Sequence, residues 1–127
     1  MKTHIFLIDD DIVEMKLFVA ALQELGDTFK CTYASNGIHA LKILQYLRPE
    51  MIFINYDMPV MNGLEFTEEI RKNKAFEYTP VFLYCSDLDP QAREKLLTLG
   101  ATLCIKKPLS QTRMLSVLKK HFSTTCK

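Results

Sequence analysis

Five short segments rich in apolar residues alternate along the chain with five segments whose apolar residues recur at helical spacing. The short segments are bounded by turn residues and by polar positions, which predicts strands. We place them at residues 5–8, 29–34, 51–55, 81–84 and 102–105. Because strands that alternate with helices are joined by crossover connections, they form a parallel sheet with helices on both faces. The sequence therefore predicts an α/β fold with three layers, α/β/α.

The helical segments carry start and stop signals. Gly26 stops the first helix, and Asn36-Gly37 opens the second, whose apolar stripe reaches Leu47. Asp89-Pro90 supplies a cap and a first-turn proline to the fourth helix. We predict helices at residues 12–25, 37–47, 64–72, 90–99 and 111–121, the last with Met114, Leu115, Leu118 and Phe122 facing inward.

Length and composition limit the class of protein. The 127 residues predict one domain over residues 1–127, without a separate output domain. A net charge of +1 gives no general attraction to nucleic acid or to a membrane, and the apolar runs are too short to span a bilayer. The four cysteines lack any Cys-x-x-Cys spacing, and no signal peptide begins the chain. We expect a cytoplasmic protein with reduced thiols and neither a zinc site nor a disulfide framework.

Polar residues follow four of the predicted strands. They are Asp9 and Asp10 after the first strand, Asn55 at the end of the third, Cys85 and Ser86 after the fourth, and Lys107 after the fifth. In an open parallel sheet, ligands bind beyond the carboxyl ends of the strands. We therefore expect these side chains to converge on one site.

The adjacent carboxylates of Asp9 and Asp10 repel each other unless a cation offsets them. A magnesium ion, which accepts one or two carboxylates together with water, is one solution. The alternative is a solvated acidic turn that caps the first helix through its dipole. The convergence of the four strand ends favours the metal site, whereas Asp11 is better placed to cap the helix than to bind metal.

Lys107 and Cys85 also allow two interpretations each. Lys107 can reach a phosphoryl oxygen as a point charge, or it is a surface lysine before the turn-forming Pro108. Cys85 is a weak hydrogen-bond donor or simply a small buried apolar residue, and Ser86 can substitute for it as a donor only if the strand end shifts.

These motifs together resemble the response-regulator receiver domain, and the resemblance covers essentially the whole chain. The matching segments are Asp9-Asp10, Asp57-Met58-Pro59-x-Met61-x-Gly63, Pro80-Val81, Gly100-Ala101 and Lys107-Pro108, in that order. The resemblance implies a flavodoxin-like fold with strand order 2-1-3-4-5. It also implies a module that signals through its fourth-helix, fifth-strand and fifth-helix face and that is not an enzyme.

The same resemblance assigns roles to single residues. Asp10 would bind magnesium directly, Asp9 would bind it through water, and the backbone carbonyl of Asp57 would be a third ligand. Lys107 would contact the phosphoryl group, and the peptide bond before Pro108 would be cis. Asn55 stands at the position of the aspartate that accepts the phosphoryl group.

Three residues depart from the family pattern. Asn55 replaces the acceptor aspartate, Cys85 replaces a serine or threonine, and Cys104 replaces an aromatic residue that acts as a rotamer gate. An amide oxygen is neutral and its electrons are delocalised, so it cannot attack phosphorus as a carboxylate does. We expect a receiver-like module that is not phosphorylated, with magnesium binding weakened by the missing charge.

Two other functions compete with this interpretation. Asp57 or Asp10 could accept the phosphoryl group as a surrogate, or Asp9-Asp10-Asp11 could belong to a small metal-dependent phosphohydrolase. The phosphohydrolase would need a second acidic loop late in the chain, where Lys107-Pro108 stands instead. The expected partners are a histidine kinase, a phosphotransfer protein or a downstream target, with a homodimer as a further option.

Overall fold

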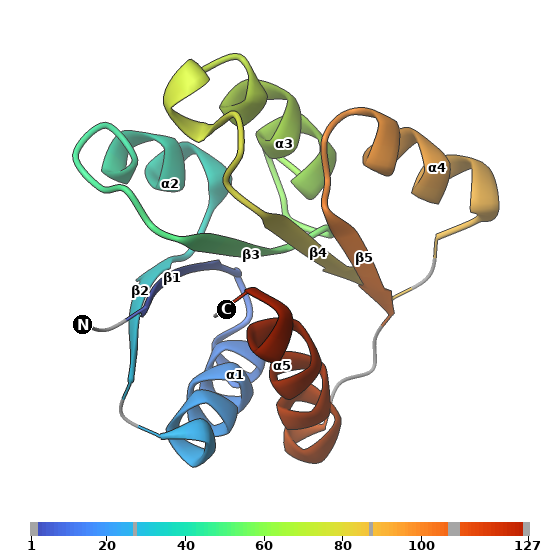
Figure 1. Ribbon diagram of the computed structural model, residues 1–127. Coiled ribbons are helices and arrows are strands. Elements are labelled where there is room, and N and C mark those ends of the chain that lie inside the picture. The colour runs from blue at the N-terminus through green and yellow to red at the C-terminus, as the bar shows by residue number, and fades with distance from the viewer. Residues whose placement is uncertain (1–2, 27, 87, 107–109, 126–127) are drawn as a thin grey trace.

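The computed structural model describes residues 3–26, 28–86, 88–106 and 110–125, with side chains up to residue 120 (Figure 1). Five strands form one parallel sheet in the order β2-β1-β3-β4-β5. The strands are β1 (Thr3–Ile8), β2 (Phe29–Ala34), β3 (Met51–Asn55), β4 (Val81–Cys85) and β5 (Leu103–Lys106). The predicted fold class and strand order are confirmed.

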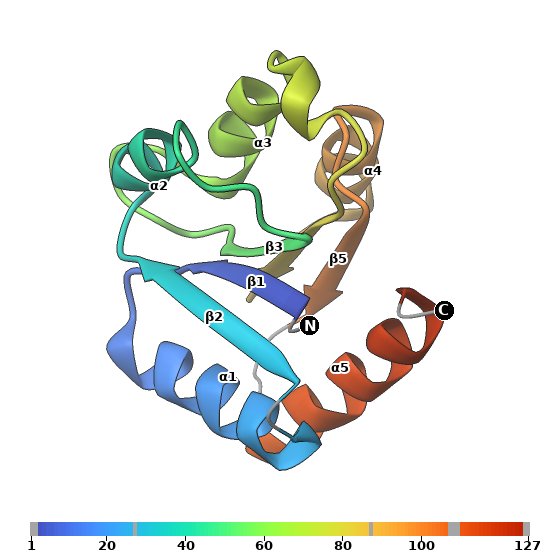
Figure 2. The same ribbon diagram turned by 60° about the vertical axis from the view of Figure 1, so that its left-hand side comes forward.

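Helices cover both faces of this sheet. They are α1 (Ile12–Leu25), α2 (Gly37–Ile43), α3 (Gly63–Arg71), α4 (Pro90–Thr98) and α5 (Gln111–Thr125), with a short 3₁₀ helix η1 (Lys74–Phe76) after α3. Figures 1 and 2 show α1 and α5 side by side on one face and α2, α3 and α4 on the other. In the described part of the chain, no helix has the length and apolar character needed to cross a membrane.

Each face of the sheet has its own apolar core. Every residue of β3 and β4 is buried, as expected of central strands covered on both sides. Side chains alternate between the two faces along a strand, so Phe53 packs toward α1 and α5 while Ile54 packs toward α2 and α3. This alternation also decides which face each polar residue at a strand end joins.

The predicted caps explain where the helices begin. The Asp11 side chain accepts hydrogen bonds from the backbone N–H groups of Val13 and Glu14, and Asn36 and Asp89 cap α2 and α4 in the same way. Asn62 forms a capping box with Glu65 at the start of α3. The prediction that Asp11 caps the first helix is confirmed.

Two helix ends differ from the prediction. Helix α2 stops at Ile43, and Leu47 lies beyond it although its side chain still packs against the core. The reason is local, because the chain turns after Leu44 and the Arg48 guanidinium donates to the Leu44 carbonyl at 2.7 Å. Helix α5 continues to Thr125, past the predicted end, and the Phe122 side chain lies outside the described ones.

Candidate functional site

Asn55 lies at the carboxyl end of β3, in the centre of the sheet, with 3% of its surface exposed. Its side-chain nitrogen, Nδ2, faces three oxygens. These are Asp9 Oδ1 at 3.3 Å, Asp10 Oδ1 at 3.1 Å and the Asp57 carbonyl oxygen at 3.2 Å. The structure therefore brings together Asp9, Asp10, Asn55 and Asp57, which are four of the residues that the sequence placed at the predicted site.

The surrounding groups fix the orientation of the Asn55 amide. Its Oδ1 accepts from the backbone N–H of Asp57 at 3.3 Å, while Nδ2 faces the oxygens. A flipped amide would turn an oxygen toward three oxygen acceptors. Because an NH₂ group has only two hydrogens, the three bonds share them, and all three distances lie at the long end of the usual range.

Asp9 is completely buried and accepts hydrogen bonds at both carboxylate oxygens. Besides the Asn55 amide, Oδ1 accepts from the Asp11 backbone N–H at 2.9 Å, and Oδ2 accepts from the Tyr84 hydroxyl at 2.6 Å. The Tyr33 hydroxyl donates to the Asp9 carbonyl at 2.6 Å. We call Asp9, Asn55, Tyr84 and Tyr33 the polar network.

The polar network joins four neighbouring strands. Tyr33 belongs to β2, Asp9 follows β1, Asn55 ends β3 and Tyr84 belongs to β4. Met51 and Phe53 face α1 and α5, so Asn55, two residues further, points to the same side. Asp9 continues β1 in the same way, since its N–H still donates to the Ala34 carbonyl of β2. The network therefore occupies the α1–α5 face.

Burial shifts the ionisation of these groups. The pKa of Asp9 is raised to about 7, chiefly because burial disfavours the carboxylate, although the hydrogen bond from Tyr84 acts in the opposite direction. The nearby Glu14 side chain raises the Asp9 pKa further. Burial, and then the charge of Asp9, raise the pKa of Tyr84 well above its usual value. Both pKa shifts favour the protonated, uncharged forms of Asp9 and Tyr84.

Asp57 contributes its backbone to the site but directs its carboxylate elsewhere. The Asp57 side chain is exposed, and its Oδ2 accepts from the Ser86 hydroxyl at 3.2 Å. Ser86 is thus near the site but contacts Asp57 rather than Asn55. Lys107 and Pro108 lie outside the described residues, so their predicted roles stay predictions.

Cys85 and Cys104 lie on the opposite face of the sheet. Cys85 follows Val81 and Leu83, which pack toward α3 and α4, and its thiol lies 3.8 Å from the Ile105 carbonyl. Both cysteines line a cavity of about 170 Å³ between β4, β5 and α4. We call this the thiol cavity; its lining is Cys85, Leu88, Arg93, Cys104, Ile105 and Lys106.

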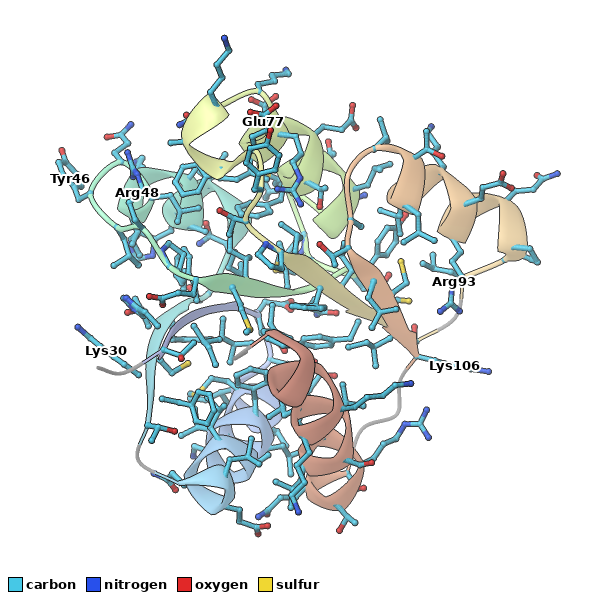
Figure 3. The ribbon with its side chains drawn as sticks, in the orientation of Figure 1. Lys30, Tyr46, Arg48, Glu77, Arg93 and Lys106 are labelled. Carbon is cyan, nitrogen blue, oxygen red and sulfur yellow. The ribbon has the colours of Figure 1, made fainter. Side chains whose placement is uncertain are left out.

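Two cations stand at the rim of the thiol cavity. Figure 3 shows Arg93 from α4 and Lys106 from β5 on the same side of the molecule. The Arg93 guanidinium donates to the Cys104 carbonyl at 2.8 Å, so it ties α4 to the outer edge of β5. Burial raises the pKa of the Cys104 thiol, which keeps it protonated.

Whether a divalent cation fits beside Asn55 depends on the atoms that surround the position. Carboxylate and carbonyl oxygens suit magnesium, but here an NH₂ group stands between them with its hydrogens toward all three. Over the described ranges, no group of three or more His, Cys, Asp or Glu side chains is arranged to hold a metal ion. With the Asn55 amide in this orientation, the residues present do not fit a cation at this position.

Sequence reasoning missed Tyr33, Tyr84 and Val60. The tyrosines could have been found from the two-residue period, because each lies on the same face of its strand as the apolar residues that pack toward α1. Val60 has a positive φ of 70° and is 85% exposed in the loop after β3. A β-branched residue rarely adopts this conformation, and no motif signals it.

The comparisons with known proteins agree with this geometry. The family model of the response regulator receiver domain matches residues 5–119. The polar-differentiation response regulator DivK of Brucella anthropi is 24% identical over 121 residues, which are 95% of this chain and 97% of that protein. The sensory transduction protein LytT of Oceanobacillus iheyensis is 28% identical, and there the match spans only 51% of its length.

Solved structures show the same arrangement of strands and helices. The chemotaxis response regulator CheY4 of Vibrio cholerae has a TM-score of 0.85 at 26% identity, with 94% of this chain and 98% of that chain covered. The receiver domain of the sensor histidine kinase PA1611 from Pseudomonas aeruginosa, solved with a magnesium ion coordinated in its active-site cleft, has a TM-score of 0.79 at 23% identity. That match covers 94% of this chain and 97% of the other.

Proposed function

Because this chain belongs to the response regulator receiver domain family, we propose that it is a receiver module that acts through protein contacts without being phosphorylated. The module extends over residues 1–127 and belongs to two-component signal transduction. It has no enzymatic activity of its own, and its site of action is the cytoplasm.

One observation carries this proposal, namely the state of the residue at the acceptor position. Asn55 is buried, and its amide is bonded on both sides, through Nδ2 to three oxygens and through Oδ1 to the Asp57 N–H. Phosphoryl transfer in this type of site depends on positioning a charged nucleophile. A neutral amide held in place by these bonds supplies no such nucleophile.

The surrogate acceptors have little support from the geometry. The Asp57 carboxylate is exposed and bonded to Ser86, while Asp10 is bonded to the amide of Asn55. Neither carboxylate therefore occupies the buried position at the end of β3. Over the described residues, no group of three or more His, Cys, Asp or Glu side chains could hold a metal ion, so a metal-dependent phosphohydrolase is also disfavoured.

The proposed module acts by presenting a surface to signalling proteins. Receiver domains contact histidine kinases and phosphotransfer proteins, and these are the proposed partners together with a downstream target. A homodimer is a further proposed assembly. Any binding of Mg²⁺ is weakened by the loss of the acceptor carboxylate, since a hard cation depends on the number of charged oxygen ligands.

The test is phosphorylation by a small-molecule donor. Wild-type protein and the Asn55→Asp variant are incubated with Mg²⁺ and acetyl phosphate, and intact mass with peptide mapping detects the phosphoryl group. Wild type is expected to remain unmodified, while Asn55→Asp gains one phosphoryl group at residue 55. The control is Asn62→Asp, which adds the same charge at the half-buried N-cap of α3.

A phosphoryl group on wild type would contradict the proposal. If peptide mapping placed it on Asp57 or Asp10, the chain would be a phosphorylatable receiver with a surrogate acceptor. Loss of the signal in Asp57→Asn or Asp10→Asn would then identify which carboxylate takes part.

A further inference from the structure

We infer that the Asn55 amide and the Tyr84 hydroxyl replace the divalent cation of this site, so that the protein holds its acidic residues together without metal. This inference rests on the proposed function, because both assign Asn55 to the acceptor position. It goes further, since a receiver that takes no phosphoryl group can still bind a cation. The two ideas are tested by different measurements.

The first argument is the position of the amide nitrogen. The resemblance to receiver domains assigns the cation to Asp10, to Asp9 through water and to the Asp57 carbonyl. In this protein the same three residues present oxygens to Asn55 Nδ2 at 3.1–3.3 Å. The hydrogens of the amide therefore point at the oxygens from the side that a cation would need.

The second argument is the chemistry of that nitrogen. An amide nitrogen has no available lone pair, because its electrons are delocalised into the C–N bond, and it carries two partially positive hydrogens. It can neutralise part of the charge of Asp9 and Asp10, but it cannot coordinate a metal. Binding a cation at this position would require the Asn55 amide to turn over or to move away, and either change would break its bond with the Asp57 N–H.

The third argument is that protein donors already occupy Asp9. Its Oδ1 accepts from Asp11 N–H, and its Oδ2 accepts from Tyr84 O–H at 2.6 Å, in a fully buried position. A ligand that holds a metal-bound water needs an accessible oxygen with a free acceptor direction. Tyr84, supplied by β4, bonds the other carboxylate oxygen from the one that Asn55 contacts, so both oxygens of Asp9 have protein donors.

The consequence is a sheet edge closed by hydrogen bonds between side chains. Tyr33, Asp9, Asn55 and Tyr84 connect β2, β1, β3 and β4 at the end where a receiver holds its ion. Buried polar groups that are satisfied in this way specify one arrangement of the elements that carry them. We expect this arrangement to be the same at any magnesium concentration.

The experiment measures metal binding in the absence of any phosphoryl donor. Wild type, Asn55→Asp and the charge-matched control Asn62→Asp are freed of metal with a chelator and titrated with Mn²⁺ and with Mg²⁺. Mn²⁺ binding is followed by electron paramagnetic resonance, and the urea midpoint of unfolding is measured with and without Mg²⁺. The site on the chain is located by Mn²⁺ broadening of backbone amide NMR signals.

Wild type is expected to show no saturable binding at its polar network and no change of the urea midpoint with Mg²⁺. Asn55→Asp is expected to bind at least about tenfold more tightly than wild type, because a carboxylate replaces the amide among the oxygens. Its midpoint should rise with Mg²⁺, whereas that of Asn62→Asp should not. Tyr84→Phe in the Asn55→Asp background should strengthen binding further by releasing Asp9.

Two results would overturn the inference. One is saturable Mn²⁺ binding by wild type that broadens the signals of residues 9–11 and 57. The other is a folded Asn55→Asp that binds no more tightly than wild type, since something other than the amide would then exclude the ion. If Asn55→Asp does not fold, the wild-type titration decides alone.

The experiments distinguish an error in this inference from an error in the proposed function. A wild type that binds Mg²⁺ yet takes no phosphoryl group from acetyl phosphate contradicts only the replacement of the cation. A wild type that becomes phosphorylated contradicts the proposed function, whatever its affinity for metal.

Discussion

At the carboxyl edge of the sheet, the face covered by α1 and α5 differs from the face covered by α4. On the first, Asp9, Asn55 and Tyr84 are buried and bonded to one another. On the second, Cys85 and Cys104 line the thiol cavity, and the Cys85 thiol lies 3.8 Å from the Ile105 carbonyl. One face is closed by hydrogen bonds, and the other retains about 170 Å³ of space.

If the proposed function holds, this difference separates the part of a phosphorylation switch that the chain has replaced from the part that it has lost. Where receivers accept the phosphoryl group and the cation, new donors from β3 and β4 satisfy the acidic residues. Where the resemblance expects a hydroxyl and an aromatic gate, two small thiols leave a cavity. The changes on the two faces are consistent, because a site without a phosphoryl group needs no hydroxyl to contact it and no gate to respond.

The largest expected effect is the pH dependence that Asp9 gives to the α1–α5 face. Its pKa is about 7 in the folded protein and 3.8 when unperturbed, so the folded state holds more protons between these values. The Asp9 contribution to stability is therefore fully present at pH below 3.8 and is lost as the pH rises toward 7. The expected loss over the whole range is on the order of 4 kcal/mol.

Urea unfolding of wild type and Asp9→Asn at about pH 5 and about pH 8 measures this contribution. The difference between the two proteins isolates Asp9 from His4, whose pKa is lowered by burial and which acts in the opposite direction. An equal slope in both proteins would show that Asp9 titrates normally and that its burial does not hold it neutral.

The second prediction removes the centre of the polar network. Asn55→Ala takes away the donor shared by Asp9, Asp10 and the Asp57 carbonyl, and should reduce the free energy of unfolding by about 2 kcal/mol in metal-free buffer. Urea denaturation with a chelator present gives the value. Asn73→Ala, an exposed asparagine in a turn, is the control and should lose less. Equal losses would mean that the network contributes no more than an ordinary turn.

The third prediction tests the bond between β4 and Asp9. Tyr84→Phe keeps the ring in the core but removes the hydroxyl that donates to Asp9 Oδ2, and should lower stability by about 1 kcal/mol. Tyr78→Phe, at a position that is 90% exposed, should be neutral. Thermal unfolding monitored by circular dichroism is sufficient for the comparison. If Tyr84→Phe were as stable as wild type, the hydrogen bond from Tyr84 to Asp9 would not stabilise the site.

The smallest effect is expected on the thiol face. Cys104→Phe can place its ring in the adjoining cavity, and should change the free energy of unfolding by about 0.5 kcal/mol or less. The same enlargement at Ala40, which is fully buried in the opposite part of that core layer, should be destabilising by more than about 1 kcal/mol. A large loss for Cys104→Phe in urea unfolding would show that the two faces are equally closed.

Much of the fold could be predicted from the sequence because its signals are local. Short apolar runs and helical patterns placed all five strands and five helices, and Asp11, Asn36 and Asp89 marked helix starts. The errors lie where tertiary contacts decide the outcome. Leu47 continues the apolar stripe of α2, yet the turn held by Arg48 ends the helix earlier. The 3₁₀ helix η1 was missed because its one buried residue, Phe76, gives no periodic signal.

The sequence predicted part of the site's membership but not its bonding, and Cys85, which was also expected there, lies on the opposite face of the sheet. Asp9, Asp10, Asn55 and Asp57 follow from the strand ends and the loop motif, and the structure brings them together. The sequence does not say which atom of the Asn55 amide faces the acids, nor that Tyr84 of β4 reaches Asp9 across the sheet. Those facts depend on register and on the packing of three strands at once.

The central claim is that the Asn55 amide hydrogens face the acidic oxygens and stay there when magnesium is present. The most direct measurement is ¹⁵N–¹H NMR of the Asn55 side-chain NH₂ group, assigned by comparison with Asn55→Asp, during a Mg²⁺ titration. The account predicts two well-separated hydrogen signals that exchange slowly with water and do not move at millimolar Mg²⁺. Signals that shift saturably with Mg²⁺ toward solvent-exposed values would contradict it.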